Sequence, residues 1–177
     1  MRAARISAIR CRLIALWAMC WLAWPVAADS ADAKIKAGYL FNFTRLVEWP
    51  TPGDEPLHVC VVGADAVVEQ LGELASRDSK GRALQIWSGT EELQICQLLY
   101  IDGDSAMLPG LLQQTKSRAV LTVSDQLGFA ARGGGIGFYR EQDQIKVEIN
   151  PQTVSGAQLK VNALLMEIAR IVVPSKP

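Results

Sequence analysis

The sequence predicts an α/β fold: a single three-layer domain with a mostly parallel sheet flanked by helices, a C-terminal antiparallel hairpin and a closing helix. Short apolar segments with little polar alternation recur along the chain, which is typical of strands buried on both faces. Helical segments separate these strands, an order typical of a parallel sheet. In the last third, apolar residues alternate with polar ones around a turn, which indicates a hairpin with one wetter face.

The composition fits one globular domain. The chain has 177 residues, of which 50% are hydrophobic and 20% are charged. These values argue against a collagen, a disordered tail or a long repeat array. No internal repeat and no linker rich in Pro, Gly or Ser divides the chain.

The first 28 residues have the order of a secretory signal. Residues 1–12 carry four arginines and no acid, residues 13–24 are uncharged and mostly apolar, and small residues follow. Twelve helical residues span only about 18 Å of a roughly 30 Å hydrocarbon core, too little for a membrane anchor. We therefore expect cleavage after Ala28, export from the cytoplasm, and a domain at residues 29–177 that is not inserted in the membrane.

The predicted exported domain is acidic. Without the four N-terminal arginines, 14 basic residues face 18 acidic ones, which gives a net charge of −4. An acidic surface without a Lys/Arg cluster disfavours nucleic acid as a partner.

Two cysteines remain after cleavage, Cys60 and Cys96. An oxidising compartment favours a disulfide between them, and closing this loop contributes about 4 kcal/mol in the chain-entropy model. A pair of buried free thiols is the alternative. A zinc site is disfavoured because these cysteines and His58 lack the usual ligand spacing, and we expect no metal or cofactor.

A helix is predicted at residues 32–48. Its apolar face comprises Ile35, Tyr39, Phe43, Leu46 and Val47. Leu40 and Phe41 widen this face, so one of them could contact another protein. Pro50 and Pro52 end the helix, because proline lacks an amide hydrogen and forces the preceding residue out of the helical region.

Four segments are predicted strands of the parallel layer. They consist largely of aliphatic residues and span residues 57–62, 82–87, 95–101 and 119–123. The strand at 82–87 is the least apolar, so we expect it nearer an edge. Two further helices are predicted between the strands, at residues 66–75 and 105–115.

The hairpin is predicted around a turn at residues 141–144. Its inward-facing apolar residues are Ile136, Phe138, Ile145, Val147 and Ile149. Asn150 followed by Pro151 predicts a helix start, because asparagine caps the amide groups and proline fits the first turn. The closing helix is predicted at residues 159–172. Its sheet-facing side chains would be Val161, Leu164, Leu165, Ile168 and Val172.

No catalytic motif is evident. The predicted exported domain has a single histidine, His58, inside an apolar strand, and it lacks a Gly-x-Ser-x-Gly elbow and a His-Glu-x-x-His helix. We therefore expect no enzyme activity. The glycine run at residues 133–137 opens a strand and lacks the Lys-Ser/Thr of a phosphate loop. A tight turn is the favoured interpretation, and a partner-contact loop is the alternative.

Several segments together resemble the YfiR family of exported bacterial regulators. They occur in the order of the family and cover nearly all of residues 29–177. They are KAGYLFNF at 36–43, EWP at 48–50, VCVVG at 59–63, Cys96, VLTVSD at 120–125, GGGI at 133–136 and EIN at 148–150.

The resemblance implies a periplasmic homodimer that binds the periplasmic domain of an inner-membrane diguanylate cyclase and represses it. Repression would lower cyclic di-GMP and biofilm formation. Cys60 and Cys96 match one family disulfide, whereas a second pair known in some members has no counterpart here.

Four residues are candidates for partner binding: Phe129, Gly134, Glu148 and Asn150. Each has a structural alternative, which for Phe129 is the core, for Glu148 an exposed strand position and for Asn150 the helix cap. The alternative function is a periplasmic small-ligand-binding sensor. Its site would be the crevice at the carboxyl ends of the parallel strands, near Gly63 and residues 124–125.

Overall fold

The computed structural model describes residues 26–50, 55–78 and 81–173. The predicted signal peptide lies outside these residues, apart from residues 26–28 at the start of the first helix. Residues 1–30 and 31–177 form separate units, and the description below concerns the second.

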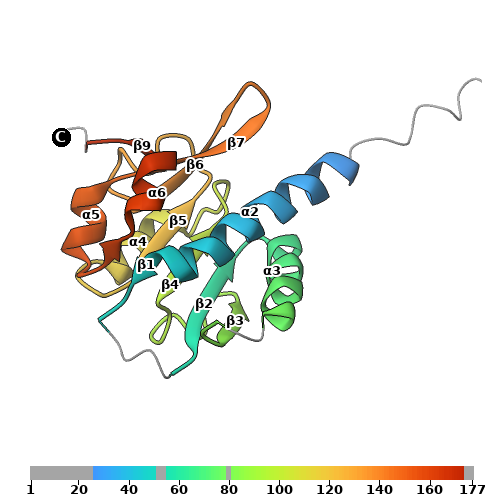
Figure 1. Ribbon diagram of the computed structural model, residues 1–177, viewed down its shortest axis with the longest axis horizontal. Coiled ribbons are helices and arrows are strands. Elements are labelled where there is room, and N and C mark those ends of the chain that lie inside the picture. The colour runs from blue at the N-terminus through green and yellow to red at the C-terminus, as the bar shows by residue number, and fades with distance from the viewer. Residues whose placement is uncertain (1–25, 51–54, 79–80, 174–177) are drawn as a thin grey trace, which may run out of the picture. The chain divides into compact units, whose positions relative to one another are not determined.

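Helices and strands alternate over the first two thirds of the described chain, as predicted (Figure 1). The elements are α2 (Val26–Leu46), β1 (Val47–Glu48), β2 (Leu57–Val62), α3 (Asp65–Arg77), β3 (Leu84–Ser88), β4 (Leu98–Ile101), α4 (Leu108–Thr115), β5 (Leu121–Ser124), β6 (Ile136–Glu141), β7 (Gln144–Ile149), α5 (Pro151–Gly156), β8 (Lys160–Val161), α6 (Ala163–Ile168) and β9 (Arg170–Ile171).

Seven strands form the main sheet, in the order β3-β2-β4-β5-β6-β7-β9. The pairs from β3 to β6 are parallel, β7 is antiparallel to β6, and β9 is parallel to β7. The chain runs from β2 to β3 on one side and then returns to β4 on the other. This reversal is a topological switch point, where ligands bind in doubly wound sheets at the carboxyl ends of the strands.

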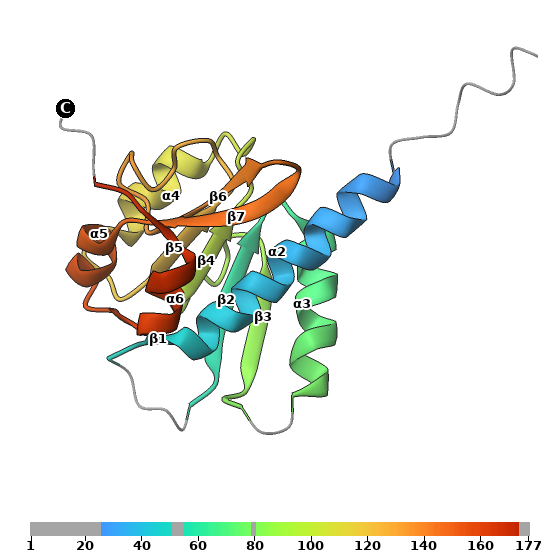
Figure 2. The same cartoon turned by 45° about the horizontal axis from the view of Figure 1, so that its top comes forward.

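Helices cover both faces of the parallel strands. Figure 2 shows α2 and α3 across one face, with α4 on the other. The larger core lies under α2 and α3 and contains Phe43, Leu71 and Tyr100, whereas the smaller core lies under α4 and contains Leu111 and Phe129. The predicted three-layer α/β architecture is confirmed.

The buried face of α2 differs from the predicted one. Its buried residues recur every three or four positions and are Ala33, Ala37, Leu40, Phe43 and Val47 at the junction with β1. Ile35, predicted to be buried, is 45% exposed, and Leu40 is fully buried and so does not form a protein-contact surface. Phe41 is half-buried, with the Arg45 guanidinium 4.6 Å from its ring centre.

The hairpin is confirmed in its predicted place. Glu141 pairs with Gln144, so the connection between the strands is two residues long. Both connecting residues have positive φ angles, 48° at Gln142 and 60° at Asp143. These angles define the turn whose twist matches that of the two strands, and Asp is among the residues that tolerate them.

The bounds predicted for the closing helix, residues 159–172, are wrong. This segment divides into β8, the short α6, and β9. Asn162 interrupts it, because its side chain accepts a hydrogen bond from the Leu164 amide and starts a new helix. The residues after α6 include β-branched Ile171, which favours a strand, and they extend along β7.

Cys60 and Cys96 are joined by a disulfide between β2 and the loop before β4. Their Cα atoms are 5.9 Å apart, within the usual range for a disulfide, and both residues are buried in the smaller core. The bridge closes a loop of 36 positions that includes α3 and the edge strand β3.

We expect reduction of this disulfide to lower the melting temperature by on the order of 10 °C, because about 4 kcal/mol of chain-entropy stabilisation is lost. Calorimetry with and without reductant measures the change. A Cys60→Ala/Cys96→Ala variant is the control, since its melting temperature should not respond to reductant. Equal melting temperatures of the oxidised and reduced wild-type protein would contradict the expectation.

Candidate functional site

The glycine turn folds around Phe129. The ring is 1% exposed, and the Phe129 carbonyl accepts a hydrogen bond of 3.0 Å from the Gly134 amide. A Cβ atom at Gly134 would collide with the ring, so only glycine fits there without a shift. Two of the four predicted partner-binding residues are therefore in direct contact, inside the domain.

Asn150 joins three parts of the chain. Its side-chain oxygen accepts hydrogen bonds of 3.1 Å from the amides of Gln152 and Thr153, which confirms the predicted cap of α5. Its side-chain nitrogen donates to the Ala130 carbonyl at 2.9 Å, and its backbone amide donates to the Gly135 carbonyl at 2.9 Å. Asn150 thus fixes the glycine turn relative to β7 and α5.

Glu148 lies near the carboxyl end of β7 and is 3% exposed. Its Oε2 accepts a hydrogen bond of 2.5 Å from Arg170 on β9, and this bond raises the pKa of the Arg170 guanidinium. The same guanidinium lies 3.9 Å from the centre of the Tyr139 ring. Gly137 on β6 leaves the space that the Glu148 side chain occupies. Glu148 therefore links β9 to the hairpin.

The four predicted partner-binding residues lie in the segment 129–150, which contains β6 and β7, but all four are buried. They hold together the glycine turn, the hairpin, α5 and β9. None presents a side chain to solvent in this arrangement, so their contribution to partner binding stays a prediction.

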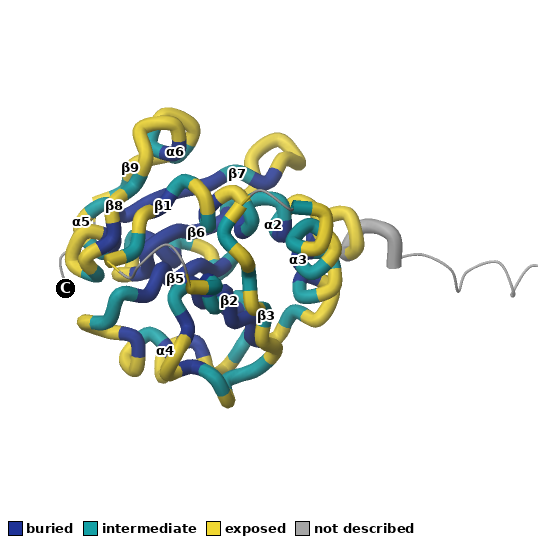
Figure 3. The backbone as a smooth tube through the Cα atoms, turned by 60° about the horizontal axis from the view of Figure 1, so that its bottom comes forward, coloured by how far each residue is buried: buried dark blue, intermediate teal, exposed yellow. Residues whose placement is uncertain are grey.

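Four exposed apolar residues occur on α6 and in the segment after it. They are Leu164 (60% exposed), Ile168 (63%), Ile171 (48%) and Val173 (71%). The first two are four positions apart and share one side of α6. Figure 3 shows α6 mostly in yellow, in contrast with the dark blue central strands. We call these four residues the α6–β9 apolar surface. The prediction that Leu164 and Ile168 face the sheet is therefore wrong.

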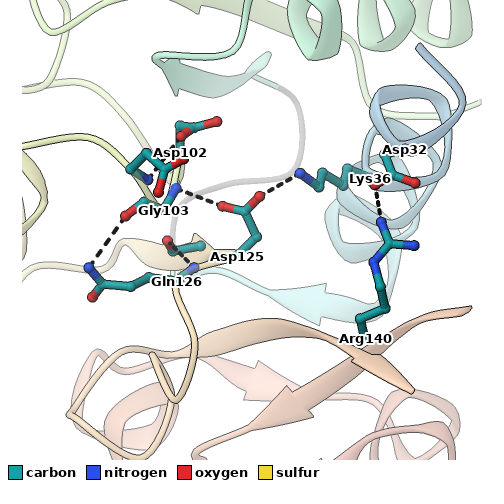
Figure 4. Close-up of polar contacts among 9 residues, drawn as sticks. Asp32, Lys36, Asp102, Gly103, Asp125, Gln126 and Arg140 are labelled. Carbon is teal, nitrogen blue, oxygen red and sulfur yellow. Dashed lines mark hydrogen bonds and ion pairs between the residues drawn. The ribbon is translucent and has the colours of Figure 1, made fainter. Parts of the chain in front are cut away.

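A second site lies at the carboxyl end of β5. The Asp125 carboxylate accepts a hydrogen bond of 2.6 Å from the Gly103 amide, which follows β4, and one of 2.5 Å from Lys36 on α2 (Figure 4). Arg140 on β6 forms an ion pair with Asp32, one turn from Lys36 on α2. A pocket of about 270 Å³ lies beside these pairs. Of the residues predicted to form a crevice at the strand ends, Asp125 lines this pocket, whereas Gly63 and Ser124 do not.

Other chemistry is sparse in the part of the chain that the structure describes. No group of three or more His, Cys, Asp or Glu side chains is placed to hold a metal ion there. The Nδ1 atom of His58 lies 3.3 Å from the indole nitrogen of Trp87, its hydrogen-bond donor on β3. Within residues 26–50, 55–78 and 81–173, no helix is both long and apolar enough to cross a bilayer.

The fold is a doubly wound α/β domain extended by an antiparallel hairpin. The chain belongs to the YfiR/HmsC-like family, whose model (DUF4154) matches residues 33–170. This family is regulatory rather than catalytic. No curated protein matches the chain significantly.

Among solved structures, the chain resembles an ABC domain from Streptococcus pneumonia in complex with L-Trp. The TM-score is 0.54 at 10% sequence identity, and the match covers 77% of this chain and 60% of that one. At this identity the likeness concerns the fold alone.

Replacing Asn150 tests how much the buried hydrogen bonds of its side chain stabilise the domain. Asn150→Ala should destabilise the domain by about 2 kcal/mol, because the helix cap is lost and the Ala130 carbonyl loses its buried donor. Asn150→Ser should cost less, since its hydroxyl keeps an oxygen that can cap the α5 amides. Urea unfolding measures both variants, and equal losses would show that the cap contributes nothing.

Glycine positions offer a matched pair of substitutions. Gly134→Ala should destabilise by roughly 1–3 kcal/mol because the new methyl group meets the Phe129 ring. Gly38→Ala should stabilise by up to about 1 kcal/mol, because open space surrounds that position and alanine favours a helix. Thermal unfolding of the two variants should therefore shift in opposite directions, and a shared direction would contradict this account.

Proposed function

We propose that this protein is a periplasmic regulator that binds the periplasmic domain of an inner-membrane diguanylate cyclase and represses it, lowering cyclic di-GMP and biofilm formation. Membership of the YfiR/HmsC-like family supports the regulatory role. The Cys60–Cys96 disulfide supports an oxidising compartment. The observation that carries the protein-binding function is the exposed α6–β9 apolar surface.

Repression of this kind needs no catalytic residue. A binding protein that prefers the inactive conformation of the cyclase shifts the equilibrium by its difference in affinity for the two conformations. Moving that equilibrium from 99:1 active to 99:1 inactive requires about 5.5 kcal/mol. A few buried apolar contacts at an interface can supply such a difference, because burying one Leu or Ile side chain contributes roughly 1.5–3 kcal/mol.

The α6–β9 apolar surface is the cyclase-binding surface in this proposal. In this proposal Phe129, Gly134, Glu148 and Asn150 contribute indirectly, by fixing the glycine turn and the end of the hairpin, and Glu148 also holds β9 through Arg170. A homodimer forms part of the same proposal, and analytical ultracentrifugation of the purified protein measures it.

Deleting the gene should raise cellular cyclic di-GMP, and expressing the wild-type chain should restore the original level. Leu164→Glu and Ile168→Glu should each fail to restore it, because a carboxylate cannot be buried in an apolar interface without a partner. Each should also weaken binding to the cyclase's periplasmic domain by at least about tenfold.

Met107→Glu is the matched control, since Met107 is 51% exposed but precedes α4 on the other face of the sheet. It should bind and repress like the wild type. The repressor proposal fails if deletion leaves cyclic di-GMP unchanged while every cyclase is intact. The assignment of the surface fails if Met107→Glu and Leu164→Glu weaken binding equally.

A further inference from the structure

Another pocket lies between α4 and α5, two helices labelled at the left of Figure 1. Its walls come from α4, the segment after α4, β5, the glycine turn and α5, and these parts contribute, in chain order, Leu112, Lys116, Thr122, Arg132 and Ala157. The pocket has a volume of about 600 Å³, within the range of sites that bind small molecules. It shares no lining residue with the pocket beside Asp125 or with the α6–β9 apolar surface.

The charged side chains of this pocket are all positive. Lys116 and Arg132 line it, and no Asp or Glu among the described residues does. Acidic residues are also missing from the surrounding sequence, because residues 105–124, 126–140 and 149–166 contain none. The pocket therefore lies in a locally basic part of an otherwise acidic domain, and its potential attracts anions.

Neither cation is neutralised by the domain itself. The ion pairs among the described residues all involve other lysines and arginines. Arg132 donates one hydrogen bond of 2.5 Å to the neutral Gln126 side chain, and the other N–H groups of its guanidinium can still bind a ligand. The carboxyl end of α4 contributes a partial charge of about −0.5, which the two full positive charges outweigh.

A buried hydroxyl adds a donor to the wall of this pocket. Thr122 is only 6% exposed, and its hydroxyl oxygen accepts a hydrogen bond of 3.0 Å from the Gly135 amide. That bond leaves the hydroxyl hydrogen to be donated, and the hydroxyl of Ser117 offers a second donor at the exposed rim. Leu112 and Val120 give the pocket an apolar part beside these polar groups.

We propose that this pocket binds a phosphate monoester, a small organic molecule that carries one phosphate group. Such a group has close to two negative charges at neutral pH and three strong acceptor oxygens, which match two cations and neighbouring hydroxyl donors. Lys116 and Arg132 bind the phosphate oxygens, and the Thr122 hydroxyl donates to one of them. The organic part packs against Leu112 and Val120. The inference does not depend on cyclase repression.

Calorimetric titration of the purified protein with n-butyl phosphate tests the proposal. This probe should bind, and three related compounds separate its parts: inorganic phosphate lacks the apolar chain, n-butyrate carries a single negative charge, and n-butanol carries none. Each should bind at least about tenfold more weakly than n-butyl phosphate. Equal binding of any of the three, or no binding of n-butyl phosphate at millimolar concentration, overturns the proposal.

Substitutions locate the site. Lys116→Met and Arg132→Met should each weaken the binding of n-butyl phosphate by about tenfold or more. Lys34→Met is the matched control and should bind like the wild type, because Lys34 is exposed on α2, across the sheet from α4. Lys116 and Arg132 are both exposed, so their variants should fold, and circular dichroism checks this. Unchanged affinity in a folded Lys116→Met or Arg132→Met variant overturns the assignment.

Discussion

The rest of the structure depends on the burial of the parallel strands on both faces. Every residue of β4 and β5 is buried, so α2 and α3 must cover one face and α4 the other. Strands enclosed in this way satisfy their backbone groups through sheet hydrogen bonds. Parallel pairing also brings the carboxyl ends of β4 and β5 to one edge. The Gly103 amide and the Asp125 carboxylate meet there as a direct result.

Elements with a purely local signal could be predicted from the sequence. The parallel strands appear as continuous apolar runs, and the hairpin and the Asn150 cap follow from turn and capping chemistry. The closing helix could not be predicted in this way, because an apolar pattern does not show which residues the core has room for. Leu165 of α6 is fully buried, whereas its neighbour Leu164 is largely exposed.

The candidate sites show the same limit. Phe129, Gly134, Glu148 and Asn150 could be grouped from the sequence, but their burial depends on the packing of segments around them. Lys36 and Asp125 are 89 positions apart, so no local pattern pairs them. The position of Asp125 at the end of the sheet could be predicted because parallel strands end at a common edge. The ion pairs that flank it come from α2 and β6, which the sheet topology alone does not position.

The attachment of β9 has a consequence for how the domain opens. Two residue pairs and a backbone hydrogen bond of 2.9 Å from the Val172 amide to the Ile149 carbonyl join this segment to β7, and the Glu148–Arg170 hydrogen bond is the charged link between β7 and β9 among the described residues. A segment held by so few contacts exchanges with an open form at a free-energy cost far below that of global unfolding. We therefore expect β9 to be the part of the main sheet that opens at the lowest free-energy cost.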